Sequence, residues 1–178
     1  YNAVPSDDYA YEPFEIFHII NIYMLISQEI ILNEGPNLIA FNSLPENSSI
    51  DNVLSPIVGN AEAIIGEGIA ASWCFFSCPD NNFGWTGNLN SFSYEDGYWV
   101  MVNEDVNLTI YGNDSPNNLI YNLHAGANLI SYSPRVSSGL SSAIPDDVED
   151  SFLAILGQGS AAMNTQEEGW VGYLNTLQ

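Results

Sequence analysis

The residues most suited to chemistry in this chain do not form a recognisable catalytic set. The two histidines, His18 and His124, lie in unrelated sequence contexts, and no His-Glu-x-x-His, Gly-x-Ser-x-Gly or Cys-His arrangement is present. Serines occur without an adjacent base, and the abundant carboxylates single out no acid and base pair. The sequence therefore favours a protein that is not an enzyme.

Two glycine motifs have the residue types of a phosphate-binding loop. Residues 66–71 read Gly-Glu-Gly-Ile-Ala-Ala and residues 157–162 read Gly-Gln-Gly-Ser-Ala-Ala, which match a variant of the dinucleotide-binding fingerprint. That fingerprint requires a helix after the glycines, because the N-terminus of the helix receives the pyrophosphate. A polar loop and another strand pattern follow here, so we interpret both motifs as tight turns at strand ends.

The same motifs belong to an internal duplication. Gly66 and Gly157 are 157 − 66 = 91 residues apart, and a second pair, Gly35 and Gly126, is separated by 126 − 35 = 91 residues as well. Two motifs that recur in order at one offset indicate a tandem repeat of a small module. The elements that position any functional site are therefore expected to occur twice.

The first copy carries an insertion that contains both cysteines of the chain. A Gly-Trp-x-Gly-x-Leu motif occurs at Trp85 and at Trp170, only 170 − 85 = 85 residues later, so six extra residues lie before Trp85. Cys74 and Cys78 fall in this insertion. Their spacing is compatible with a small disulfide loop in an oxidising compartment, and free thiols are the alternative.

Composition restricts the partners and the location. The 178 residues include 22 acidic residues, no lysine and Arg135 as the only arginine, for a net charge of −21. Such a chain cannot neutralise phosphates, which excludes nucleic acid and anionic membrane surfaces as partners. Its longest unbroken apolar run in the N-terminal region, Ile22 to Ile26, is far too short to span a membrane. We expect an extracellular protein in a cation-rich medium, with Tyr1 as a processed start.

Period-2 apolar patterns separated by glycine, asparagine and proline turns predict a mostly β fold. We expect two tandem antiparallel β-sandwich or barrel modules, each with one short helix, at Ser48–Leu54 and Ser138–Ile144. A hairpin is expected around Gly35 and again around Gly126. The predicted strands of the two modules are residues 29–32, 37–42, 61–65, 97–102, 106–111, 119–123, 128–132 and 152–156.

The second copy is incomplete. The segment Gly97–Gly112 of the first copy has no counterpart after Gln178, whereas Phe14–Ile26 has the apolar character of the missing strands. We therefore divide the chain into a lead-in and donor strand segment (1–26), β module 1 (27–112) and β module 2 (113–178). The candidate assembly residues are Phe14, Ile16, Phe17, Ile20, Ile22, Met24 and Ile26.

The missing strands of module 2 could be accounted for in three ways. It could complete module 2 within its own chain, or it could complete module 2 of the next copy and link copies head to tail. A third possibility is that the chain is part of a longer protein that supplies the missing strands.

Three further groups of residues are candidates for modification or contact. Asn-x-Ser/Thr sequons, which accept N-linked glycans, occur at Asn47, Asn107 and Asn113. Aromatic residues in the insertion, Trp73, Phe75 and Phe76, could contact a ligand such as carbohydrate. Core packing is the alternative for the repeated Trp85 and Trp170.

Acidic clusters at 103–105 and 146–150 offer oxygen ligands suited to calcium, although neither has EF-hand spacing. A solvated acidic face is the favoured interpretation of both clusters. We therefore expect no cofactor and no metal centre, with Ca²⁺ as the one ion that the composition leaves open.

The ordered motifs resemble a repeat of large secreted or cell-surface proteins of marine bacteria. That repeat runs Gly-x-Asn-Leu-Ile-Ser, Gly-x-Gly-x-Ala-Ala, Gly-Trp-x-Gly-x-Leu and Gly-Tyr-Trp, and the resemblance covers Glu29–Gly112 and Leu119–Leu177. It implies an extracellular location and no established catalysis. This chain departs from the pattern at Pro36, in the cysteine insertion and in the absent second Gly-Tyr-Trp.

Together these patterns favour a non-enzymatic extracellular structural protein, whose copies form a filament or surface assembly by N-terminal strand donation. The alternative is an accessory carbohydrate-binding or adhesion module of a larger secreted protein.

Overall fold

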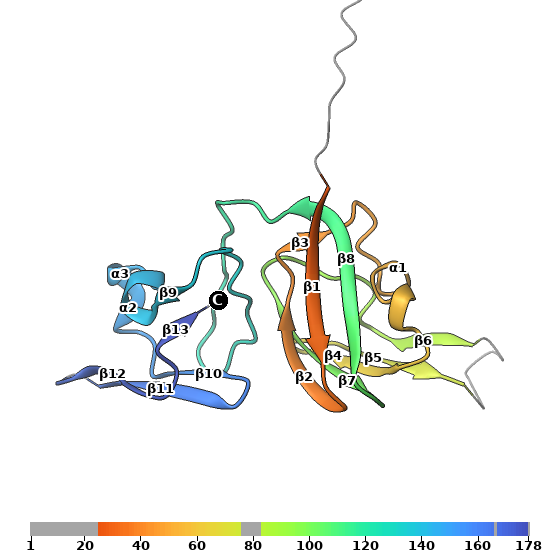
Figure 1. The fold of residues 1–178 in the computed structure, drawn as a ribbon. Coiled ribbons are helices and arrows are strands. Elements are labelled where there is room, and N and C mark those ends of the chain that lie inside the picture. Colours follow the sequence, from red (N-terminus) through yellow and green to blue (C-terminus); the bar gives the residue numbers. More distant parts are fainter. Residues whose placement is uncertain (1–24, 76–82, 166, 178) are drawn as a thin grey trace, which may run out of the picture.

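The computed structural model describes residues 25–75, 83–165 and 167–177. As the sequence predicts, the fold is mostly β, with antiparallel sheets and a few short helices. Figure 1 shows the elements in two groups, joined by the segment that follows strand β8. The described elements of module 1 run from β1 to β8, and those of module 2 run from β9 to β13.

Module 1 is built from two antiparallel sheets and two short helical turns. The larger sheet has the order β2 (Gly35–Ala40), β7 (Gly97–Val102), β4 (Ala61–Ile65), β5 (Ala70–Cys74) and β6 (Gly84–Gly87). The smaller has the order β1 (Ile26–Leu32), β8 (Val106–Asp114) and β3 (Ser43–Leu44). Helix α1 (Ile50–Val53) and the 3₁₀ turn η1 (Ser55–Ile57) connect β3 to β4.

Among the described residues, the main hydrophobic core cluster lies in module 1. Its buried cluster extends from Leu32 to Ile110 in sequence and includes Tyr98, Val100 and Val102, three alternate residues of β7. Alternation places these side chains on one face of the strand, where the smaller sheet and α1 cover them. The Tyr98 ring lies 4.9 Å from the Phe92 ring and 5.8 Å from the Phe41 ring, measured between centroids. Strand β7 thus lies between β2 and β4 in the larger sheet and is a main contributor to the core.

The predicted hairpin around Gly35 is wrong. Strand β1 pairs with β8 and strand β2 pairs with β7, so the turn at Gly35 carries the chain from one sheet to the other. The side chain of Asn37 holds this turn: its Oδ1 accepts a bond from the Asn33 amide at 2.9 Å, and its Nδ2 donates to the Asn33 and Gly35 carbonyls. A clamp of this kind fixes a bend between sheets without pairing the two strands.

Module 2 repeats only part of this arrangement. It contains a three-stranded sheet of β10 (Ala154–Gly157), β11 (Ser160–Thr165) and β12 (Gly169–Gly172), and a two-stranded sheet of β9 (Ser138–Gly139) and β13 (Thr176–Leu177). Helix α2 (Leu140–Ala143) matches the predicted second helix, and α3 (Asp146–Glu149) was not predicted. The order β10-β11-β12 corresponds to β4-β5-β6 of module 1.

One glycine in each module shows that the backbones of β4-β5-β6 and β10-β11-β12 have closely similar local geometry. Gly87 and Gly172 have φ angles of 150° and 151°. A Cβ atom at Gly87 would lie 2.1 Å from the Ala70 carbonyl oxygen, and one at Gly172 would lie 2.2 Å from the Ala161 carbonyl oxygen. Only glycine fits such a contact, which accounts for the repeated Gly-Trp-x-Gly motif.

The second predicted hairpin is also wrong, because residues 119–123 and 128–132 form no strand of either sheet. The turn between them is nevertheless that of module 1: Asn128 accepts a bond from the His124 amide at 2.9 Å and donates to the His124 and Gly126 carbonyls. The sequence therefore specifies the local turn in both modules. In module 1, β1 pairs with β8 and β2 pairs with β7, and no strands equivalent to β7 and β8 occur among the described residues of module 2.

Burial follows the same division. Among the described residues of module 2, the buried hydrophobic side chains are Leu140, Ile144 and Ala162. Leu32 is 0% exposed whereas its repeat Leu123 is 43% exposed, and Ile39 is 7% exposed whereas its repeat Ile130 is 40% exposed. Within the described ranges, no helix is both long and apolar enough to cross a membrane.

Candidate assembly site

The outer edge of β10 is the first part of the candidate site. In module 1, the equivalent strand β4 pairs with β5 on one side and with β7 on the other. Strand β10 pairs with β11, and within the described part of the chain no strand lies against its other edge. An unpaired edge next to exposed apolar side chains is a template for another strand.

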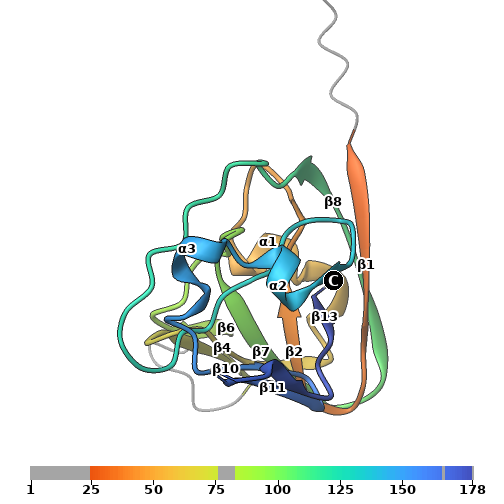
Figure 2. The same ribbon diagram turned by 90° about the vertical axis from the view of Figure 1, so that its left-hand side faces the viewer.

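The start of β1 is the second part, since the donor segment precedes it. Ile26 pairs with Gly112 of β8, and its carbonyl accepts a hydrogen bond from the Ser43 hydroxyl at 3.1 Å. Ile26 is therefore bound within module 1, whereas the other six candidate assembly residues lie outside the described residues. Figures 1 and 2 show that β1 begins at the end of module 1 opposite to the β10-β11-β12 sheet.

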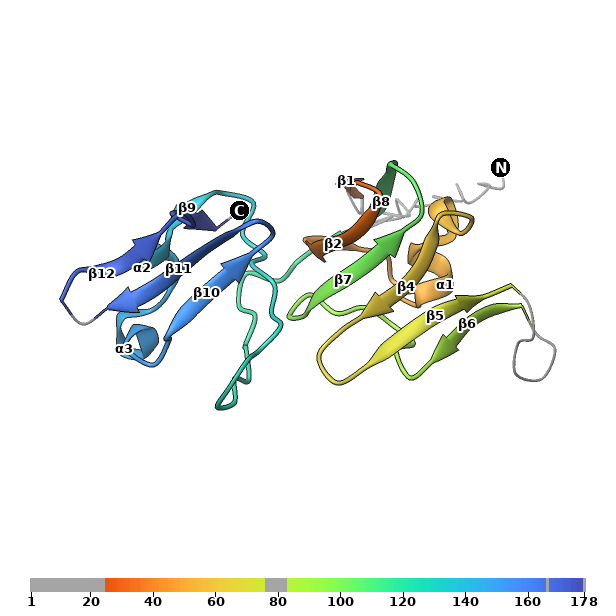
Figure 3. The same cartoon turned by 90° about the horizontal axis from the view of Figure 1, so that it is seen from below.

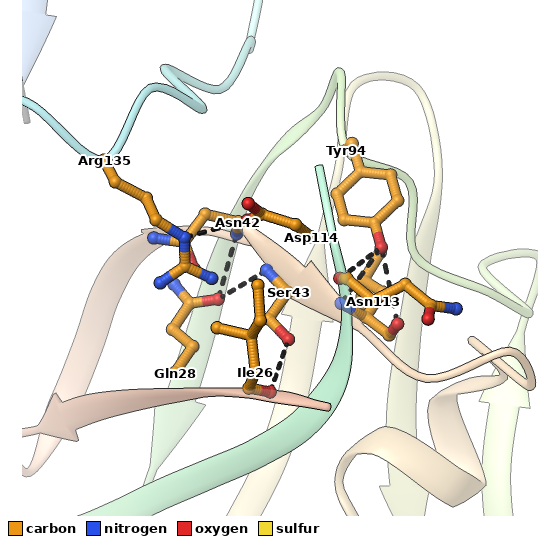
Figure 4. Close-up of polar contacts among 9 residues, drawn as sticks. Ile26, Gln28, Asn42, Ser43, Tyr94, Asn113, Asp114 and Arg135 are labelled. Carbon is orange, nitrogen blue, oxygen red and sulfur yellow. Dashed lines mark hydrogen bonds and ion pairs between the residues drawn. The ribbon is translucent and has the colours of Figure 1, made fainter. Parts of the chain in front are cut away.

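Gln28 ties this end of β1 to the end of β2 and the start of β3, and Figure 4 shows its contacts with Asn42 and Ser43. Its Oε1 accepts hydrogen bonds from the amides of Asn42 at 2.9 Å and Ser43 at 3.2 Å, and its Nε2 donates to the Ala40 carbonyl at 3.0 Å. Three bonds to one side chain fix the direction in which the chain enters module 1. Sequence reasoning missed Gln28, because a glutamine in an apolar strand gives no specific signal.

Tyr94 fixes the neighbouring end of β8, where the chain leaves module 1. Its hydroxyl donates to the Asn113 carbonyl at 2.8 Å and accepts from the Leu44 amide at 3.2 Å. Burial raises the pKa of Tyr94, with a further upward contribution from the Asp114 charge and a downward one from the Leu44 bond. The hydroxyl is thus protonated at neutral pH and serves as a structural link between β3 and β8.

Arg135 joins module 2 to this same end of module 1. Its Nε donates to the Asp114 carboxylate at 2.8 Å, and both side chains are partly exposed. Arg135 is the only arginine or lysine in a chain with 22 acidic residues. An exposed pair of this kind contributes about 0–1 kcal/mol, and it orients rather than stabilises the junction.

Two turn loops make reciprocal contacts across the junction. The Glu67 carboxylate in the β4–β5 loop accepts a hydrogen bond from the Leu129 amide at 2.6 Å, and Gln158 Oε1 in the β10–β11 loop accepts one from the Leu38 amide at 3.0 Å. These are repeat positions, because 158 − 67 = 91 and 129 − 38 = 91. Each module therefore uses the same loop to contact the same position of the other, and Figure 3 shows each loop pointing toward the opposite module.

Glu67 also forms an ion pair with His124 through its other oxygen. The pKa of Glu67 is lowered, mainly by the Leu129 amide and then by the His124 side chain. The pKa of His124 is raised, mainly by its hydrogen bond to the Ala125 carbonyl and then by Glu67. The repeat positions of His124 and Glu67 are Asn33 and Gln158, and neither of these side chains carries a charge. Of the two loop contacts, only the one made by Glu67 and His124 therefore changes its charge with pH.

Residues 129–131 lie along the segment of module 1 that precedes β7. The Gly97 amide donates to the Leu129 carbonyl at 3.0 Å, and the Ser131 amide donates to the Glu95 carbonyl at 2.9 Å. These bonds form an antiparallel bridge between Asp96 and Ile130. The segment is docked on module 1 although it belongs to module 2.

Among the remaining candidate residues that the structure describes, only Asn113 takes part in this site, through the bond that its carbonyl accepts from Tyr94. Cys74 is disulfide-bonded, and Cys78, its expected partner, lies outside the described residues, as does Phe76. The Trp73 ring packs edge-on against Trp85 at 5.4 Å and Phe75 at 5.9 Å between centroids, and Phe75 is 47% exposed. The sequon residues Asn47, Asn107 and Asn113 are all exposed, and the last two lie in β8 rather than in a turn.

In each of the two acidic clusters, one carboxylate accepts a hydrogen bond from a residue distant in sequence. Asp105 accepts a hydrogen bond from the Glu34 amide at 2.8 Å, and Glu149 accepts one from the Trp170 indole at 2.6 Å. Among the described residues, no group of three or more histidine, cysteine, aspartate and glutamate side chains is placed to hold a metal ion.

The two Gly-x-Gly motifs are turns between antiparallel strands, without the following helix that a dinucleotide site requires. The chain matches no protein-family model, no curated protein and no solved structure. Any functional conclusion therefore rests on the geometry of the molecule itself.

Proposed function

We propose that this chain is a non-enzymatic extracellular structural subunit that forms a filament or surface assembly. In this proposal, the N-terminal segment of one copy completes module 2 of the next, so that copies join head to tail. The observation that carries the proposal is the contrast between Leu32, which is buried, and its repeat Leu123, which is 43% exposed in a module where no described strand takes the place of β7 or β8.

Module 2 leaves apolar side chains and the main-chain groups of the β10 edge exposed. Apolar surface removed from water contributes roughly 25 cal/mol per Å², and each strand added to an edge supplies main-chain hydrogen bonds. The segment from Phe14 to Met24 supplies alternating apolar residues in a chain that is otherwise acidic. A donor of this composition fits an edge flanked by exposed apolar side chains better than it fits solvent.

The position of β1 supports donation between copies rather than within one chain. Because β1 starts at the end of module 1 opposite to β10, a donor that returned to its own module 2 would have to run back along the whole of module 1. The network around Gln28 fixes the start of β1 and opposes such a reversal.

Removal of residues 1–24 tests the proposal. The described elements begin after this segment, so the shortened chain retains both modules. We expect the full chain to form polymers in electron micrographs and in sedimentation velocity, and the shortened chain to remain monomeric. A full chain that is monomeric at every concentration, or polymers that persist after the deletion, would contradict head-to-tail donation.

A second candidate is an accessory carbohydrate-binding or adhesion module. Phe75 and Phe83 favour it, because both are large exposed aromatic residues at the ends of β5 and β6, 47% and 76% exposed. The deletion separates the candidates, since a sugar-binding module retains its glycan affinity without residues 1–24. Substitution of Phe83 by alanine should abolish that affinity and leave polymerisation unchanged.

A further inference from the structure

The main-chain groups of β10 define one wall of an acceptor slot. The Asn164 amide donates to the Leu153 carbonyl at 3.0 Å, so Leu153 faces β11. In an antiparallel ladder the hydrogen-bonding direction alternates along the strand, so Ile155 also faces β11 while Ala154 and Leu156 face away from it. The N–H and C=O groups of these two residues point to the side where no described strand lies.

Residues 128–130 define the second wall. Leu129 and Ser131 direct their main-chain groups toward module 1, where they bond to Gly97 and Glu95. By the same alternation, Asn128 and Ile130 direct theirs to the opposite side, and the described residues offer them no main-chain partner. The docking of one edge of this segment therefore leaves its other edge available.

In module 1 the corresponding place is occupied by β7. Asn37 and Ile39 of β2 lie opposite Val100 and Tyr98, and Ile65 of β4 lies opposite Trp99. The slot residues of module 2 are the repeats of these positions, since 128 − 37, 130 − 39 and 156 − 65 all equal 91. Two edges that β7 bridges in module 1 are thus both open in module 2.

We infer that the donated strand takes the place of β7 in module 2, between β10 and residues 128–130 and antiparallel to both, and that its source is residues 14–24 of a second copy. This inference rests on the proposed function and adds to it the position, direction and partners of the strand. It differs from simple addition to the β10 edge, in which only one side of the donor would be paired.

The donor has the pattern that this place requires. Strand β7 buries Tyr98, Val100 and Val102 on one face, and the donor carries apolar residues at alternate positions on one face as well, interrupted only by His18. Eleven residues in extended conformation reach about 36 Å at roughly 3.3 Å per residue, which exceeds the length of the four-residue strand β10.

A peptide of residues 14–24 added to the chain of residues 25–178 tests the inference. We expect saturable binding, with amide hydrogen exchange slowed at least tenfold at Leu156 on one wall and at Ile130 on the other. Leu156→Pro and Ile130→Pro should each weaken binding about tenfold, because each removes one slot-facing N–H. The controls Leu156→Val and Ile130→Val keep the N–H and should bind as the parent chain does.

The outcomes separate the two proposals. Protection of Leu156 without Ile130, or proline variants that bind as the parent does, would overturn the position between the two walls while leaving strand donation intact. Absence of any peptide binding would count against the proposed function itself. Unchanged exchange at the β11 amides in Leu156→Pro would show that the variant keeps its β10–β11 pairing.

Discussion

Glu67 and Gln158 occupy the same position of the duplicated sequence, and each accepts a main-chain hydrogen bond from the opposite module. Residue i of one module contacts residue j of the other and the reverse contact is also present, which is the defining property of a two-fold interface. The two loop contacts of one chain are therefore arranged as those of a symmetric dimer would be.

The reciprocal contact predicts matched effects of two substitutions. Glu67→Ala should speed amide exchange at Leu129 and leave Leu38 unchanged, whereas Gln158→Ala should speed exchange at Leu38 and leave Leu129 unchanged. Both bonds are exposed, so we expect each substitution to have only a small effect on the free energy of unfolding. Exchange measured by NMR would contradict the reciprocal arrangement if both amides responded to either substitution alone.

The Glu67–His124 pair predicts a pH window for the junction. The raised pKa of His124 gives a stabilising contribution that is complete below the ordinary value of 6.5 and is lost as pH rises through the raised value. The lowered pKa of Glu67 gives a contribution that is complete above 4.5 and is lost as pH falls through the lowered value. Both contributions are present between pH 4.5 and 6.5, where the junction should be most ordered.

A histidine titration checks this window. The chain of residues 25–178 contains His124 as its single histidine, so its imidazole signals can be assigned directly. Glu67→Gln should lower the pKa of His124, while Glu62→Gln, a change at an exposed residue of β4, should leave it unchanged. An identical titration of His124 in the Glu67→Gln variant would rule out the pair in solution.

The unequal burial of repeat positions predicts unequal costs of the same substitution. Leu32→Ala empties a fully buried site and should destabilise module 1 by about 2–5 kcal/mol, whereas Leu123→Ala at a 43% exposed site should cost less than about 1 kcal/mol in the monomer. Denaturant unfolding of the chain without residues 1–24 measures both. Assembly should increase the cost of Leu123→Ala, and equal costs in monomer and polymer would argue against completion of module 2.

The close contacts of Gly87 and Gly172 predict that alanine at either position lowers the stability of its own three-stranded segment. Gly87→Ala and Gly172→Ala each place a Cβ about 2 Å from a carbonyl oxygen at a φ near 150°, and each should cost roughly 2–4 kcal/mol. Gly59→Ala, where nothing lies within 4 Å, provides the control. Thermal unfolding monitored by tryptophan fluorescence should show lower midpoints for the first two variants only.

The sequence predicts the local elements of this fold better than their partners. Glycine and tryptophan spacing indicated that β4-β5-β6 would recur, and β10-β11-β12 is that recurrence. The hairpins around Gly35 and Gly126 were wrong, because a strand pattern followed by a glycine turn does not reveal which strand lies opposite. In module 1, the hydrogen bonds of the Asn37 side chain hold the bend that takes the chain from one sheet to the other.

The candidate site was predictable only in part. The missing second Gly-Tyr-Trp motif predicts that Leu123 and Ile130 lack the partners of Leu32 and Ile39, and both are exposed in the structure. The network of Gln28 and the contact of Gln158 with Leu38 could not be read, because each joins residues distant in sequence through a single polar side chain. Such contacts depend on the final positions of the backbones and leave no periodic signal.

Glu67 and Gln158 each bond to a main-chain amide of the opposite module within one chain, so this surface is closed after two modules and cannot recruit a third. Growth by strand donation must use a different surface, one that is not self-complementary. The two tips of any resulting fibre would then be chemically unlike, with an empty acceptor at one and an unused tail at the other. Each tip would elongate at its own rate, and each could be blocked by a reagent that leaves the other unaffected.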